Sequence, residues 1–85
     1  MRPIVVVEDN PAIAAYIDDV LREEGYPTHI CSGGASGLAA IAQQTPSLVL
    51  LDLHLPDMTG LELISRLHTL GEPTVPIVMM TASWE

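Results

Sequence analysis

Three acidic residues follow two strongly apolar segments of the chain. Asp52 ends the apolar run 48–51, and Glu8 and Asp9 follow the apolar run 4–7. Continuous runs of Val, Ile and Leu are typical of parallel strands that are buried on both faces. If these two strands lie side by side, their carboxyl ends bring the carboxylates together, and such a cluster is costly unless a cation binds it. The sequence therefore predicts a cation site at one edge of a sheet.

The residue types indicate which cation and which chemistry. Carboxylate oxygens without an accompanying His or Cys cluster favour Mg²⁺ or Mn²⁺ over Zn²⁺. An Asp beside such a cation is a known nucleophile toward phosphoryl groups, and we assign this role to Asp52. Thr81 ends the apolar run 76–80, so its hydroxyl and the backbone N–H of Ala82 are placed to hydrogen-bond a phosphate. A single acid at a strand end is usually only a solvated cap, but acids at two strand ends favour a metal site.

The elements that position these residues alternate along the chain. We expect strands at 3–7, 27–31, 48–53 and 76–80, and helices at 11–24, 35–44 and 60–70. Asn10 is a favourable N-cap and Pro11 a favourable first helical residue. This βαβαβαβ pattern predicts a doubly wound α/β fold with a parallel sheet and right-handed crossovers. In the strand order 2-1-3-4, ligands bind beyond the carboxyl ends of strands one and three, where the acids lie.

The apolar stripes predict which side chains are buried. The residues that we expect to face the sheet are Ile13, Ile17, Val20, Leu21, Leu38, Ile41, Ala42, Leu63, Ile64, Leu67 and Leu70. Met79 and Met80 are expected to fill the core or its margin. Cys31 is expected to be a small buried residue.

Composition restricts the possible partners and surroundings. The chain has 85 residues, eleven acids, three Arg and no Lys, which gives a formal net charge of −8. Because phosphate contacts require Lys and Arg, we expect no nucleic-acid binding by this segment. The apolar runs are too short to span a membrane, no leader is visible, and the single Cys31 fits a reducing compartment. We therefore expect a cytoplasmic domain with no membrane partner.

Three segments together resemble the receiver domain of bacterial two-component response regulators. Residues 5–10 (VVVEDN) resemble the acidic pair after the first strand of that family. Residues 50–60 (LLDLHLPDMTG) resemble its phosphoacceptor segment, and residues 76–82 (PIVMMTA) its fourth strand and switch hydroxyl. The resemblance covers the whole chain and implies a flavodoxin-like fold.

The resemblance also implies a role for each matching residue. Asp52 would be the phosphoacceptor, and Thr81 the hydroxyl that reports phosphorylation. Glu8 and Asp9 would hold Mg²⁺, with the Asp52 carboxylate and the main-chain carbonyl of His54 as further ligands. The implied partner is a sensor histidine kinase or a phosphotransfer protein that carries a phosphohistidine. On this interpretation the chain is a phosphorylation switch and not a turnover enzyme.

The sequence also departs from the family pattern. A receiver has five βα units, so helix 4, strand 5 and helix 5, another ~40 residues, are missing. The Lys that the family places after strand 5 is absent. We expect residues 1–85 to form a partial receiver domain without a second domain, with an authentic N-terminus and impaired phosphorylation or output. The exposed edge of the fourth strand predicts self-association or an exchanged element.

Two other functions are compatible with the same residues. A magnesium-dependent phosphoesterase would also cluster acids, although its Asp-x-Asp pattern reads Asp52-Leu53-His54 here. A structural or dimerisation module with an inactive acidic site is a third possibility. The glycine-rich segment 33–37 lacks the spacing of a phosphate-binding loop and is interpreted as a plain turn.

Overall fold

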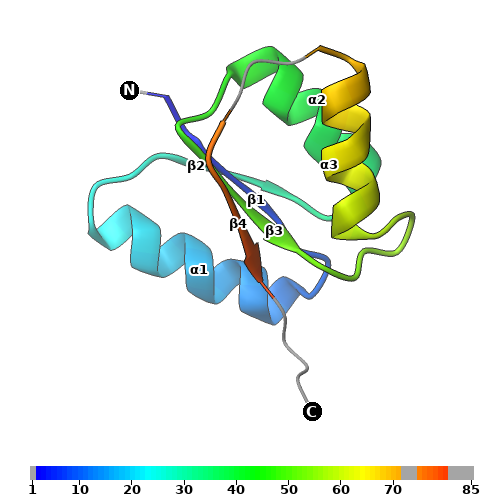
Figure 1. Ribbon diagram of the computed structural model, residues 1–85. Helices are drawn as coiled ribbons and strands as arrows, with labels where there is room; N and C mark the ends of the chain where they lie inside the picture. Colours follow the sequence, from blue (N-terminus) through cyan, green and yellow to red (C-terminus); the bar gives the residue numbers. More distant parts are fainter. Residues whose placement is uncertain (1, 72–74, 81–85) are drawn as a thin grey trace.

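The computed structural model describes residues 2–71 and 75–80 (Figure 1). In chain order the elements are β1 (Ile4–Val7), α1 (Pro11–Glu23), β2 (Thr28–Cys31), α2 (Gly34–Gln44), β3 (Leu48–Asp52), α3 (Gly60–Thr69) and β4 (Ile77–Met80). Every predicted element is present, and each differs from its predicted bounds by one residue at one end.

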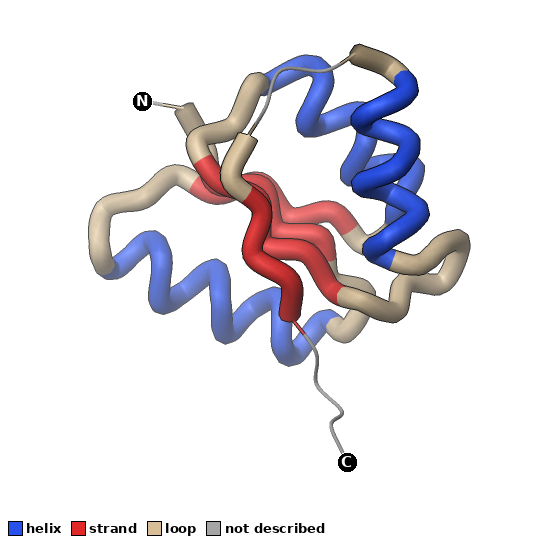
Figure 2. The backbone as a smooth tube through the Cα atoms, in the orientation of Figure 1, coloured by secondary structure: helices blue, strands red, loops and turns tan. Residues whose placement is uncertain are grey.

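The four strands form one parallel sheet in the order β2-β1-β3-β4, which confirms the predicted topology. Helix α1 covers one face of the sheet, and α2 and α3 cover the other (Figures 1 and 2). Val7 lies opposite Leu51 in the register of β1 and β3. Glu8 follows Val7 and Asp52 follows Leu51, so this register places the two acids beside each other.

Local sequence explains how the chain leaves β1. The side chain of Asn10 accepts hydrogen bonds from the N–H groups of Ala12 (3.0 Å) and Ile13 (3.2 Å), and Pro11 is the first helical residue. This cap satisfies N–H groups that the first turn of α1 leaves without partners. It begins the helix directly after the acidic pair and therefore keeps the connection between Asp9 and α1 short.

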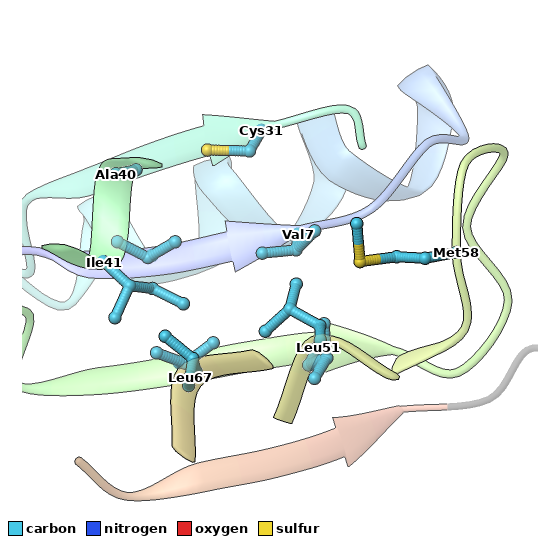
Figure 3. Packing of buried hydrophobic residues seen from close by; sticks show 10 residues of the cluster. Val7, Cys31, Ala40, Ile41, Leu51, Met58 and Leu67 are labelled. Carbon is cyan, nitrogen blue, oxygen red and sulfur yellow. The ribbon is translucent and has the colours of Figure 1, made fainter. Parts of the chain in front are cut away.

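The main core lies between the sheet and the helices α2 and α3. Its buried members are Val5, Val7, Cys31, Ala40, Ile41, Val49, Leu51, Met58, Leu63 and Leu67 (Figure 3). Gly37 allows α2 to approach β1 closely, because a Cβ atom there would lie 2.9 Å from Val7 Cγ2. Cys31 is buried within this core as predicted.

Several predicted core positions are wrong. Val20, Ala42 and Leu70 are exposed, and Met79 on β4 is 37% exposed. Ala42 lies on the solvent side of α2, where Ala40 and Ile41 face the sheet instead. Leu70 is the C-cap of α3 and lies beyond the last turn that packs on the sheet. Met79 is exposed because β4 is an edge strand that pairs only with β3 among the described strands.

None of the helices in the described ranges 2–71 and 75–80 has the length and apolar character that a membrane crossing requires.

Candidate functional site

The structure brings Glu8, Asp9 and Asp52 together at the carboxyl edge of the sheet. One carboxylate oxygen from each residue lies within 4.8 Å of the other two. Glu8 and Asp52 are only 5% and 8% exposed, whereas Asp9 is exposed. The cluster therefore has two buried acids at its base and one acid that faces solvent.

Burial first, and neighbouring carboxylates second, disfavour the charged form of Glu8. Burial raises the pKa of Glu8 above its usual range, and the carboxylates of Asp52 and Asp9 raise it further. The backbone N–H of Asn10 donates to Glu8 Oε2 (3.1 Å) and offsets part of this effect. A cation among these oxygens would remove the repulsion, so the donor set fits a hard divalent ion such as Mg²⁺.

Asp52 also has a local hydrogen-bond partner. The backbone N–H of His54 donates to Asp52 Oδ1 over 3.3 Å, which places the His54 peptide beside the acidic cluster. The imidazole of His54 is exposed, as expected if only its main chain takes part. The other predicted site residues, Thr81 and Ala82, lie outside the described residues.

The loop between β3 and α3 folds back on the end of β3. The N–H of Gly60 donates to the carbonyl of Leu53 (2.8 Å), and His54 pairs with Thr59 as a single antiparallel bridge. A Cβ atom at Gly60 would lie 2.7 Å from the carbonyl oxygen of Asp52. Only glycine permits this approach, which explains why Gly60 is needed for the shape of the loop.

Sequence reasoning assigned no role to Asp57. Its carboxylate accepts hydrogen bonds from the N–H groups of Gly34 (2.7 Å) and Ala35 (2.9 Å), so it caps α2 from a distant loop. Gly33 is the N-cap residue of α2, and it has no side chain that could cap the helix. The signal that could have indicated an external acceptor is a helix that begins Gly34-Ala35 and has a glycine, Gly33, at its N-cap. The predicted plain turn at 33–37 is wrong, because Gly33 is the N-cap of α2 and residues 34–37 form its first turn. Two amides of this segment donate to Asp57, so they are not free to bind a phosphate.

We predict that this cap weakens at acidic pH. The N–H groups of Gly34 and Ala35 hold the pKa of Asp57 below its ordinary value of 3.8. A depressed pKa means that the cap is fully present above the unfolded-state pKa and is lost as the pH falls through the folded-state value. The amide resonances of Gly34 and Ala35 should therefore shift together with a midpoint below 3.8. A midpoint at or above that value would contradict the cap.

Comparison with known proteins decides the family. The family model for the response regulator receiver domain matches residues 4–85. The chain belongs to this family. The acidic cluster at the ends of β1 and β3 lies within the matched residues of this receiver chain.

Three known proteins illustrate the similarity. The DNA-binding response regulator MtrA of Mycolicibacterium smegmatis is 43% identical over 79 residues, which are 93% of this chain and 34% of MtrA. Sporulation initiation phosphotransferase F of Bacillus subtilis is 33% identical over 82 residues, 96% of this chain and 65% of that protein. A CheY-like receiver domain from Methanospirillum hungatei superimposes with a TM-score of 0.89 at 34% identity, covering 100% of this chain and 67% of that structure. The receiver chain thus spans about a third of MtrA and about two thirds of the other two proteins.

Proposed function

We propose that this receiver chain accepts a phosphoryl group on Asp52 in a two-component phosphorelay. The observation that carries the proposal is the placement of Asp52, which is buried and lies within 4.8 Å of two further carboxylates at the carboxyl edge of the sheet. A buried acid beside two other carboxylates is costly to the fold unless a cation pairs with it, and this placement suits a nucleophile that works beside a cation. The chain acts as a phosphorylation switch in this proposal, not as a turnover enzyme.

The proposed donor is a phosphohistidine on a sensor histidine kinase or a phosphotransfer protein. An oxygen of the Asp52 carboxylate attacks phosphorus while the P–N bond of the donor breaks. The bonding electron pair stays on the ring nitrogen, which then takes a proton. The name of sporulation initiation phosphotransferase F, to which this chain is 33% identical, is consistent with such a transfer.

The residues that would hold Mg²⁺ are Glu8 and Asp9, with the carboxylate of Asp52 and the main-chain carbonyl of His54. When bound, the ion would neutralise the carboxylates and the phosphoryl oxygens. Thr81 keeps its proposed role as the hydroxyl that contacts the phosphoryl group, together with the backbone N–H of Ala82.

Acetyl phosphate with Mg²⁺ tests the proposal directly. We expect the intact mass to increase by one phosphoryl group, and we expect no increase when EDTA removes the metal. Repeated release of phosphate from an unrelated ester such as p-nitrophenyl phosphate would instead support a phosphoesterase. Failure of both reactions in folded protein would support a structural module with an inactive acidic site.

We also propose that the 85-residue chain associates with itself through β4. Val78 is 49% exposed and Met79 is 37% exposed, and β4 is hydrogen-bonded to β3 alone among the described strands. An edge strand with exposed apolar side chains offers a free row of backbone donors and acceptors. A second copy of the chain supplies the matching edge.

A lysine on this edge is expected to shift the chain toward the monomer. Val78→Lys places a charge where two edges would meet, so its sedimentation coefficient should fall relative to the parent chain at equal concentration. Val20→Lys is the matched control. It makes the same substitution at an exposed position on α1, away from the β4 edge. A parent chain that sediments as a monomer at every concentration would refute the association.

A further inference from the structure

The cap that Asp57 places on α2 also connects that helix to the acidic cluster. Asp57 lies at the tip of the loop between β3 and α3, and its two carboxylate oxygens accept from consecutive N–H groups at the start of α2. The two glycines at this point allow the loop to approach. A Cβ atom at Gly33 would lie 3.3 Å from Asp57 Oδ1, and one at Gly34 would lie 2.4 Å from Met58 Cγ. The start of α2 is therefore shaped around this loop.

A series of backbone hydrogen bonds links the loop around Asp57 to Asp52, the proposed phosphoacceptor. Met58, the next residue, is buried and points from the loop toward Val7 and the core (Figure 3). Its carbonyl accepts the N–H of Leu55 over 3.1 Å, and the base of the same turn is the bridge between His54 and Thr59. The N–H of His54 then donates to Asp52 Oδ1. These contacts all lie within residues 52–59.

We propose that Asp57 is a positioning residue: by tying the loop to the N-terminus of α2, it fixes the His54 peptide beside Asp52. The consequence for metal binding rests on the proposed function, in which the carbonyl of that same peptide is a ligand. Groups that orient metal ligands from behind commonly change metal affinity by about 10-fold or more when they are removed. Asp57 makes no contact with the cation in this proposal and acts only through the loop.

Three variants separate this role from a general loss of stability. Asp57→Ala removes both acceptors, and Asp57→Asn keeps one carbonyl oxygen that still caps an N–H group. Ala40→Gly weakens α2 at a buried position without touching the cap. Asp19→Ala removes an exposed acid from α1 and controls for the change in net charge.

The first measurement is made without metal on the full chain. In Asp57→Ala we expect the amide resonance of His54 to shift and its hydrogen exchange to accelerate, with partial recovery in Asp57→Asn. Ala40→Gly and Asp19→Ala should leave the His54 amide unchanged. An unchanged His54 amide in Asp57→Ala, or an equal change in Ala40→Gly, overturns the inference whatever the metal does.

The second measurement titrates Mg²⁺ by calorimetry or by NMR shifts. We expect Asp57→Ala to weaken Mg²⁺ binding by about 10-fold, and Asp57→Asn to recover part of the loss. Equal affinity in Asp57→Ala and the parent chain would overturn the metal-linked part of the inference. If the parent chain itself binds no Mg²⁺, the proposed function fails, and the His54 amide alone then supports or overturns the positioning role.

Discussion

An Asp52→Asn variant is expected to lose phosphorylation completely. The amide of Asn is no nucleophile toward phosphorus, and it also removes one of the charged oxygens from the cluster. Asn keeps the size of Asp and a carbonyl oxygen that accepts the N–H of His54, so the fold should be preserved. After incubation with acetyl phosphate and Mg²⁺, the intact mass of the variant should stay at its starting value while the parent chain gains a phosphoryl group.

The control for this experiment is Asp19→Asn, which makes the same chemical change at an exposed position on α1. It should be phosphorylated at the rate of the parent chain. Phosphorylation of Asp52→Asn at a rate similar to that of the parent would show that another residue accepts the phosphoryl group. Equal circular dichroism spectra of the parent chain and both variants would exclude unfolding as the cause of a lost signal.

The strands and the first helix cap could be predicted because the order of residue types within short segments determines them. The apolar runs in β1 and β3 contain no alternation, and this identifies buried parallel strands before any contact is known. The acids that end these runs must then meet, since parallel neighbouring strands end at the same edge of the sheet. The same reasoning predicted the N-cap at Asn10, where all the interacting groups lie within three residues.

The unpredicted part depends on contacts between distant segments. Helical periodicity places Val20 and Leu70 on the apolar face of their helices, but it does not indicate where the neighbouring element ends. The contact between Asp57 and α2 joins residues that are 22 and 23 positions apart, and it requires the loop to have its folded shape. Such a contact is visible in the sequence only as an uncapped helix start at Gly33.

A Glu8→Gln variant is expected to change stability and metal binding in opposite directions. In the metal-free chain, Gln removes a buried charge that lies among two other carboxylates, so the free energy of unfolding should rise by roughly 1 kcal/mol. With Mg²⁺ present, the parent chain gains stability from binding, by about 1.4 kcal/mol at a concentration 10-fold above Kd, and the variant should gain much less. Thermal or urea unfolding with and without Mg²⁺ measures both effects.

The matched control is Asp9→Asn, which removes the same charge from the same cluster at an exposed position. Because solvent already screens Asp9, its removal should stabilise the metal-free chain less than Glu8→Gln does, while still weakening Mg²⁺ binding. A Glu8→Gln chain that is less stable than the parent without metal would show that Glu8 holds the fold together through the N–H of Asn10. The opposite signs distinguish a site that is strained until a cation binds from a set of acids that only caps the strand ends, because mere capping acids would give no extra stability with Mg²⁺.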